Sequence, residues 1–294
     1  MKLKFLSACF GVFLCLFSQN SIAQNYDTVQ IKTIKLTEKV YMLQGAGGNI
    51  GVLLGRDGIV LIDDQFAPLT EKIKNALKIL SNKPVRFIIN THYHGDHTGG
   101  NENFAGEGAI IVAQDNSRLR MTTDQFNATI NMTQKAAPME ALPKVTFTES
   151  VTLYLNNETV QVYHVKNAHT DGDAIIYLKE SNVFHAGDVF VRYGLPFIDQ
   201  SSGGSIDGMI NGVNNLLSFV NDSSRIIPGH GDLAVRKDLV DYQKMLIAIR
   251  SMVLGKIKEG KTLKEIVDAN PLKDYKAVFP REYFIKSVYD SLKK

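Results

Sequence analysis

Apolar side chains recur at two different periods in the first half of the chain, and the change of period predicts strands followed by a helix. Between residues 49 and 63, two short apolar segments flank the turn sequence Gly-Arg-Asp-Gly at 55–58. This arrangement predicts a β-hairpin. Residues 69–80 then carry apolar side chains at helical spacing, with Ile73 and Leu77 on one face. This spacing predicts an amphipathic helix that covers a sheet.

The segment after this helix contains two more apolar runs and ends in a loop. Residues 84–90 form a short β-branched run, and residues 109–113 form a second one. Both are typical of buried strands. A polar segment that favours a helix begins at residue 116, and residues 136–143 show no periodic pattern.

The second half of the chain repeats this plan. Residues 151–165 predict a hairpin that turns at Asn156-Asn157, and residues 174–184 predict another that turns near 180–182. A helix is expected at 206–220, and a short strand at 225–227. Hairpins followed by helices, twice over, indicate two sheets packed face to face with helices outside.

The C-terminal third is predicted to be helical and to lie on the outer surface. Residues 238–259 and 280–294 carry the helical patterns. No linker, low-complexity tract or charge run divides residues 24–294. We therefore expect one domain over this range.

The N-terminus has the pattern of a secretory signal peptide. Lysines at positions 2 and 4 precede an apolar stretch from Phe5 to Phe17, and Ser21-Ile-Ala23 supplies a small-residue cleavage signature. The apolar stretch is shorter than the roughly 20 residues that a membrane-spanning helix needs. We expect residues 1–23 to be removed, and the mature protein to be periplasmic or secreted without stable membrane insertion.

Cysteine and charge content narrow the possible chemistry. Cys9 and Cys15 both lie in the predicted signal segment, so the mature protein would have no disulfide, thiolate ligand or cysteine nucleophile. The chain has 33 basic and 30 acidic residues, and removal of Lys2 and Lys4 leaves 31 basic residues. A nearly neutral mature chain gives no electrostatic case for binding nucleic acid.

Four potential metal ligands stand within six residues, in Thr-His92-Tyr-His94-Gly-Asp96-His97. Buried without a partner, these side chains would each lose hydration, and charged histidines would repel one another. A divalent metal removes both problems, and imidazole and carboxylate suit zinc, with iron or manganese as further candidates. The motif follows a predicted strand, and a bend at Gly95 would aim the two pairs of ligands differently, which suits two adjacent metals.

Three other residues at the ends of predicted strands can complete such a site. His169 opens a tight polar turn, His230 lies in Pro228-Gly-His-Gly, and Asp188 could join two metals through its two oxygens. His185 either hydrogen-bonds a ligand or packs in the core. His164 lies inside a predicted strand, where a metal ligand is not expected.

The order of these motifs resembles that of the metallo-β-lactamase superfamily. The residues that carry the resemblance are Leu61-Ile-Asp63, His92-x-His94-x-Asp96-His97, His169, Asp188 and His230. The resemblance implies an α+β fold, a four-layer αββα sandwich of two mixed β-sheets flanked by helices, with a dinuclear site at one edge. It implies that one metal is held by His92, His94 and His169, that the other is held by Asp96, His97 and His230, and that Asp188 bridges them.

The residue at position 188 separates branches of that superfamily. The β-lactamases commonly have Cys or Ser there, whereas a bridging Asp is typical of glyoxalase II-like and lactonase-like members. The sequence therefore predicts an exported hydrolase with two Zn²⁺ ions per chain. Its small-molecule substrate remains open among amides such as β-lactams, esters, lactones and thioesters.

The predicted mechanism uses a hydroxide shared between two zinc ions, because one zinc already lowers the pKa of water to about 7. Asp96 is expected to orient this hydroxide and to relay its proton. Arg192 and Tyr193 follow Asp188 and are candidates for holding a substrate carboxylate and an oxyanion respectively.

Two other functions suit the same ligands. One is a mononuclear iron dioxygenase that acts on persulfides, and the other is a non-catalytic metal-binding protein. The sequence leaves the oligomeric state open.

Overall fold

Two mixed β-sheets form the centre of the computed structural model, which describes residues 25–293. The first sheet contains, in spatial order, β1 (Lys32–Lys35), β2 (Val40–Gln44), β3 (Ile50–Leu53), β4 (Ile59–Ile62), β5 (Val85–Ile89), β6 (Ile110–Gln114) and β9 (Val145–Phe147). The second contains β10 (Ser150–Leu155), β11 (Glu158–Val165), β12 (Asp173–Leu178), β13 (Val183–His185) and β14 (Arg225–Ile227). In each sheet the early strands pair antiparallel and the last strands pair parallel.

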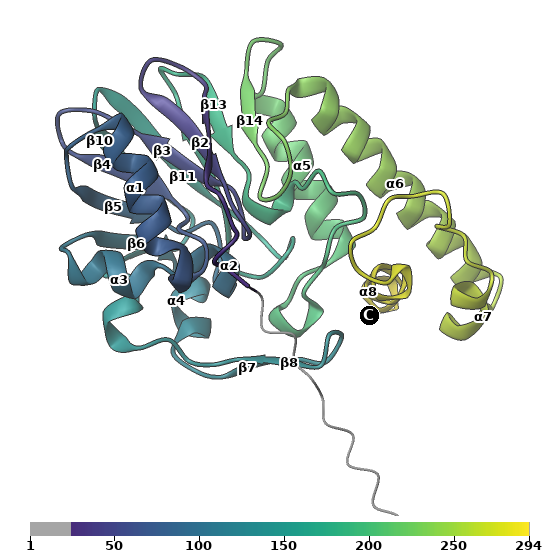
Figure 1. Cartoon of the computed structure of the whole chain (residues 1–294). Coiled ribbons are helices and arrows are strands. Elements are labelled where there is room, and N and C mark those ends of the chain that lie inside the picture. Colours follow the sequence, from purple (N-terminus) through teal and green to yellow (C-terminus); the bar gives the residue numbers. More distant parts are fainter. Residues whose placement is uncertain (1–24, 294) are drawn as a thin grey trace, which may run out of the picture.

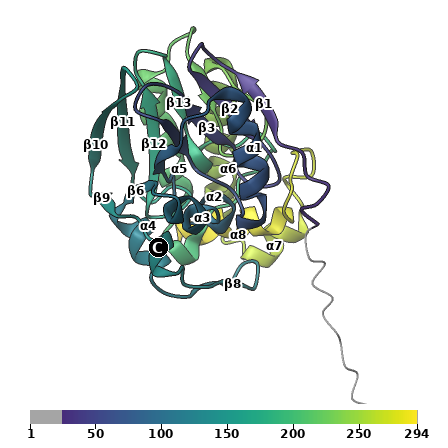
Figure 2. The ribbon, with the colours of Figure 1, turned by 60° about the vertical axis from the view of Figure 1, so that its left-hand side comes forward.

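Helices cover the outer face of each sheet. The α-helices are α1 (Thr70–Leu80), α2 (Gly95–Thr98), α3 (Asn101–Gly106), α4 (Asp115–Met121), α5 (Ile206–Phe219), α6 (Arg236–Lys258), α7 (Leu263–Asp268) and α8 (Arg281–Leu292). Short 3-10 turns are η1 (Ala67–Leu69), η2 (Met139–Ala141), η3 (Gly187–Val189) and η4 (Gln200–Ser202). Figures 1 and 2 show α1 outside the first sheet and α5 and α6 outside the second.

Three hydrophobic layers hold these elements together. In β4, Ile59 and Leu61 pack toward α1, whereas Val60 and Ile62 pack between the sheets. This alternation follows from the two-residue repeat of a strand that is buried on both faces. On the far side, α5, α6 and α8 pack on the second sheet. The predicted αββα sandwich is therefore confirmed.

The elements predicted from the sequence form close to the expected positions. Both hairpins of the second half turn where expected, and Asn156 and Asn157 have φ values of 56° and 55°. Their left-handed backbone suits asparagine better than most other residues. The sequence analysis did not predict β1, β2, β9, α7 or the separate hairpin of β7 (Gln125–Asn127) and β8 (Met132–Gln134). The predicted signal segment, with Cys9 and Cys15, lies outside the described residues.

Two turns join the sheets at one end of the sandwich. The backbone N–H of Asn156 donates to Oδ2 of Asp57 at 2.7 Å, and the N–H of Asp57 donates to Oδ1 of Asn156 at 2.8 Å. The side-chain amide of Asn156 also donates to the carbonyl of Gly58. This contact connects the hairpin turn of the first half with that of the second.

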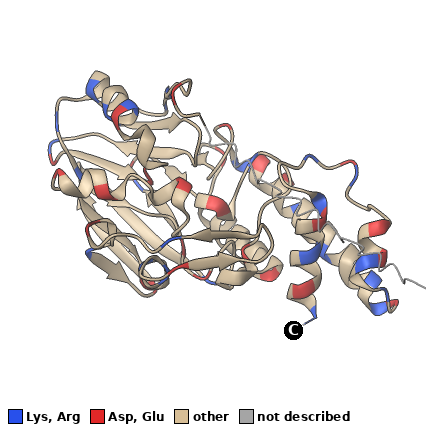
Figure 3. Cartoon of the chain, turned by 60° about the horizontal axis from the view of Figure 1, so that its bottom comes forward, with Lys and Arg blue, Asp and Glu red and all other residues tan. Residues whose placement is uncertain are grey.

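Charged residues are mixed over the surface of the described chain. Figure 3 shows lysine and arginine interspersed with aspartate and glutamate, including on the C-terminal helices. Within residues 25–293, no helix has both the length and the apolar character that crossing a membrane requires.

Candidate metal centre

The predicted metal ligands lie in loops at one edge of the two sheets. His92 follows β5, His169 lies between β11 and β12, Asp188 follows β13, and His230 follows β14. Because β4 and β5 run parallel, as do β13 and β14, their carboxyl ends meet at this edge. The four loops can therefore converge although they are far apart in sequence.

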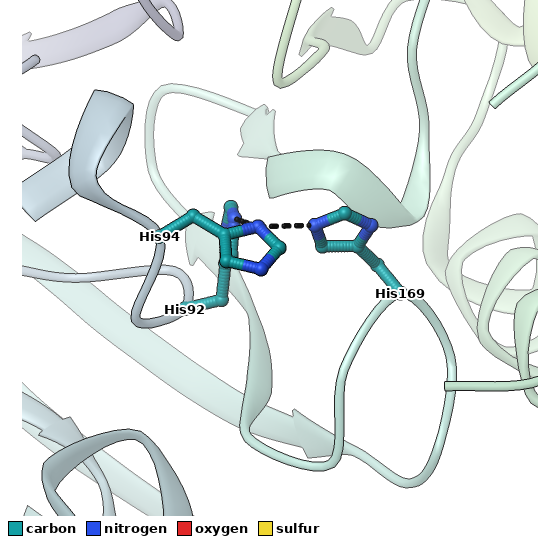
Figure 4. Close-up of side chains that lie close together, drawn as sticks. All are labelled: His92, His94 and His169. Atoms are coloured by element: carbon teal, nitrogen blue, oxygen red, sulfur yellow. Dashed lines mark hydrogen bonds between the residues drawn. The ribbon is translucent and has the colours of Figure 1, made fainter. Parts of the chain in front are cut away.

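The first group of ligands consists of three histidines. Nδ1 of His94 lies 2.9 Å from Nε2 of His169 and 3.2 Å from Nε2 of His92. Figure 4 shows the three rings turned toward one another, from two loops on opposite sides of the site. His92 and His169 are buried, and His94 keeps 18% of its side chain exposed. Three ring nitrogens facing one point form a set suited to a divalent metal.

The second group contains Asp96, His97 and His230. Nε2 of His230 lies 3.2 Å from Oδ2 of Asp96 and 3.3 Å from Nε2 of His97. His97 is buried, whereas Asp96 and His230 remain partly exposed. The short helix α2 begins at Gly95 and carries Asp96 and His97, which form a group with His230, whereas His92 and His94 form one with His169. His92 and His97 also form a group with Asp188, so the two groups adjoin. The sequence thus supplies two adjacent groups of ligand atoms.

Asp188 lies between the two groups. Its Oδ1 is 3.3 Å from Nε2 of His97, and its Oδ2 is 3.8 Å from Nε2 of His169. The residue is only 7% exposed, and Oδ1 has no hydrogen-bond donor. A buried carboxylate oxygen without a partner is costly, and a cation between the two groups would satisfy it. The residues present therefore fit a metal centre.

Carboxylates and a carbonyl hold the far side of three ligand rings. Oδ2 of Asp63 lies 2.8 Å from Nδ1 of His97, and Oδ2 of Asp199 lies 2.9 Å from Nε2 of His94. The carbonyl of Phe197 lies 2.8 Å from Nδ1 of His169. Such partners fix the orientation of a metal-binding imidazole and make it more basic.

Asp199 was missed in the sequence, where no motif or glycine marks it. Besides His94, this buried carboxylate accepts hydrogen bonds from the Tyr93 hydroxyl and the Asn127 amide. Asn127 ends β7, and Gln134 at the end of β8 accepts the N–H of Gly95. The β7–β8 hairpin therefore supports the metal-binding loop from outside, and it runs along the lower edge of the molecule in Figure 1.

Burial and charge set the protonation of the ligands. Burial lowers the pKa of the His169 imidazole to about 4, so this ring is neutral at pH 7. Burial would also lower the pKa of His230, but Asp188 and Asp96 raise it to about 9. Burial would raise the pKa of the Asp188 carboxyl, but His230 and His97 hold it well below its ordinary range. Asp188 is thus in the ionised form that binds metals.

A glycine allows the close packing around His97. A Cβ atom at position 48 would lie 2.2 Å from Cε1 of His97. The backbone N–H of Gly48 also donates to the carbonyl of Asp96 at 3.0 Å. A larger residue at position 48 would have to displace the His97 ring.

The remaining candidates have different surroundings. The guanidinium of Arg192 donates to the carbonyls of Asp232 and Leu233 and to the carboxylate of Asp238, none of them a predicted ligand. By contrast, the Tyr193 ring lies 5.6 Å from that of His230. Tyr193 therefore borders the metal centre, whereas the hydrogen-bond partners of Arg192 lie outside the set of predicted ligands.

Histidines 185 and 164 bond the backbone. Nε2 of His185 lies 3.0 Å from the carbonyl of Asn49, and its Nδ1 accepts the N–H of Gly187. His185 thus supports the turn before Asp188 without bonding a ligand side chain. Nδ1 of His164 lies 3.0 Å from the carbonyl of Asp173.

The sequence and the fold were compared with those of known proteins. Residues 44–230 match the family model described as the metallo-beta-lactamase superfamily. The chain belongs to the metallo-beta-lactamase superfamily. The matched residues include every predicted metal ligand, from His92 to His230.

Individual members of the superfamily are distant from this chain. The metallo-beta-lactamase type 2 of Bacteroides fragilis is 21% identical over 262 residues, which are 84% of this chain and 96% of the relative. A metallo-beta-lactamase from Pontibacter korlensis has a TM-score of 0.60 and 19% identity, over 74% of this chain and 99% of its own. The sec-alkylsulfatase Pisa1 from Pseudomonas sp. has a TM-score of 0.67 and 16% identity, over 88% and 50% respectively. Identity this low to the solved structures establishes the fold alone. The family match relates the chain to metal-dependent hydrolases, and the structure adds a His/Asp cluster that can hold metal.

Proposed function

We propose that this chain is an exported hydrolase that binds two zinc ions and cleaves a carbonyl compound, namely an amide, an ester, a lactone or a thioester. The observation that supports it best is the buried Asp188 carboxylate between two groups of ligands. A single metal would leave one of these groups unused. Export rests on the N-terminal sequence pattern.

One metal would be held by His92, His94 and His169, and the other by Asp96, His97 and His230, with Asp188 shared between them. Bound zinc would acidify a water molecule and polarise the substrate carbonyl, so no serine or cysteine nucleophile is needed.

The protein's own side chains would position the reacting groups. The Asp96 side chain is 29% exposed, so water can reach its carboxylate, which would orient the attacking water and relay its proton. The Tyr193 hydroxyl accepts the N–H of Phe197 at 3.4 Å, and its own proton is free to be donated to an oxyanion. Burial and the nearby Asp188 raise the pKa of this hydroxyl, which keeps it protonated at neutral pH.

The same zinc-bound water could attack each of these carbonyl groups, so the metal ligands do not select the substrate. Residues other than the metal ligands would therefore recognise it. The Bacteroides fragilis relative is named a β-lactamase, and the Pseudomonas structure is an alkylsulfatase. A β-lactam and a secondary alkyl sulfate therefore belong in any substrate panel. Asp at position 188 favours lactones and thioesters over β-lactams.

The test is parallel turnover of nitrocefin, an acyl lactone, a glutathione thioester, an aryl ester and a secondary alkyl sulfate by zinc-loaded protein. We expect a carbonyl substrate to be hydrolysed, and chelation to abolish the activity. Oxygen consumption with a persulfide by iron-loaded protein would favour the dioxygenase instead. Metal binding without any turnover would favour a non-catalytic protein.

A further inference from the structure

An open groove lies between the segment that follows η3 and the helix α6. One wall consists of four residues of the segment 190–194, and the other consists of the first three turns of α6 together with Lys276. This α6 groove has a free volume of about 290 Å³. A cavity of about 150 Å³ is sufficient for one benzene ring. The α6 groove therefore has room for a ring that carries a short side chain.

The α6 groove is separate from the metal centre. Arg192 and Gly194 line it, whereas Tyr193 between them does not, and the ring of Tyr193 lies 5.6 Å from that of His230. Successive side chains of this segment thus face opposite sides. The backbone N–H of Arg192 donates to the carbonyl of His230 at 2.9 Å, so the segment is fixed to the metal-binding loop. The α6 groove lies on the outer side of the segment, and the metal centre lies on its inner side.

The base of the α6 groove is apolar. Phe190, Val191 and Tyr242 are buried there, and the ring centroids of Phe190 and Tyr242 are 5.1 Å apart. Met245, three positions further along α6, is half-buried and lines the same groove. A thioether packs favourably against an aromatic ring, and burial of apolar ligand surface releases water. The base of the groove therefore favours an aromatic ring.

One positive charge at the rim of the α6 groove is free to bind an anion. Both acidic residues of the groove already have basic partners, because Asp238 pairs with Arg192 at 3.1 Å and Asp241 pairs with Lys237. Lys276 is exposed, and its ammonium group forms no ion pair with any of residues 25–293. A ligand with a single negative charge would complement this lysine.

We propose that the α6 groove binds a small aryl carboxylate, with its ring against Met245 and its carboxylate at Lys276. The volume limits the ligand to about one ring and a short chain, the apolar base selects the ring, and Lys276 selects the anion. The proposal does not depend on the proposed hydrolase function, because no predicted metal ligand lines the groove.

The test is a nuclear magnetic resonance titration of the zinc-loaded full chain, labelled in the methionine methyl groups. The Met245 signal, assigned with Met245→Leu, reports binding in the groove and distinguishes it from binding of a carboxylate to zinc. The ligands are 3-phenylpropionate, 3-phenylpropanol and 3-phenylpropylamine, which share the ring and the three-carbon chain and differ in charge. We expect 3-phenylpropionate to shift the Met245 signal and to bind about fivefold more tightly than the alcohol at low ionic strength, the upper range for an exposed ion pair. The amine should bind more weakly than the alcohol.

Two lysine variants test the role of the charge. Lys276→Met removes the ammonium group and keeps most of the apolar side chain, so the acid and the alcohol should then bind equally. Lys273→Met removes another exposed lysine, which does not line the groove, and should keep the preference for the acid within about twofold of the wild type. A Met245 signal that 3-phenylpropionate does not shift would overturn the proposal. Equal affinity for acid and alcohol in the wild type, or a preference for the acid that survives in Lys276→Met, would also overturn it.

Discussion

Oδ2 of Asp199 lies 2.9 Å from Nε2 of His94, so the other nitrogen of that ring faces His92 and His169. Asp199→Asn keeps the shape of the side chain but removes its charge. We expect the affinity for zinc to fall about tenfold or more, as is typical when the outer partner of a metal-binding histidine is changed. Competition with a chelator measures the zinc affinity of the wild type and of the variant. The exposed Asp124→Asn is the control, and an unchanged zinc affinity in Asp199→Asn would show that this carboxylate does not position His94.

Asp96 is predicted to serve both the second metal and the attacking water. Asp96→Asn retains an oxygen ligand but cannot accept the proton of the water. We expect kcat to fall about 100-fold or more, with most of the metal retained. Turnover and metal content are measured on the same preparation. Near wild-type turnover in Asp96→Asn would show that Asp96 does not accept the proton of the attacking water.

Asn156 should matter for stability, although it lies at the end of the sandwich opposite the metal centre. Its side chain bonds the N–H of Asp57 and the carbonyl of Gly58, so Asn156→Ala leaves both groups without these partners. We expect a loss of about 2 kcal/mol in the free energy of unfolding. Asn131→Ala is the matched control, because Asn131 also has a positive φ, of 50°, but is exposed. Urea unfolding of both variants gives the difference, and equal losses would assign the effect to the backbone alone.

The buried His185 should make the fold sensitive to acid. Burial lowers its pKa in the folded state below the ordinary 6.5. The unfolded chain therefore binds a proton more readily, and stability falls as the pH drops below about 6.5. One such group contributes at most about 1.4 kcal/mol per pH unit.

His185→Gln should reduce the slope of the unfolding free energy against pH. The comparison uses metal-free protein, in which the ligand histidines of the wild type and of the variant titrate alike. Unfolding free energies measured between about pH 7.5 and about pH 5, an interval of about 2.5 pH units, give the slopes. His164→Gln controls for the loss of one imidazole. A slope as steep in His185→Gln as in the wild type would contradict the prediction.

Local patterns were sufficient to predict the hairpins and the positions of the ligands. The turn at Asn156-Asn157 needs residues that tolerate positive φ, and the sequence shows such residues between two apolar runs. The histidines and Asp188 follow strands, and the carboxyl ends of parallel strands meet at one edge. These features depend on neighbours in sequence or on a general property of sheets.

Contacts between distant segments could not be predicted in this way. Asp199 lies in a loop without a motif, and its role depends on His94, which is more than a hundred positions away in the chain. The sequence predicted Arg192 near the site because it follows Asp188. In the structure its guanidinium donates to the carbonyl of Leu233 and to the carboxylate of Asp238. These partners lie just before α6 and in its first turn, about 40 positions further along the chain, so no local pattern could predict them.

The two-metal centre is tested most directly by native mass spectrometry of the zinc-loaded mature protein. Because Asp188 lies between the two groups of ligands, we expect two zinc ions per chain. Asp188→Ala should lower the number of bound zinc ions. A wild-type protein that binds one ion at most under saturating zinc would contradict the dinuclear hydrolase.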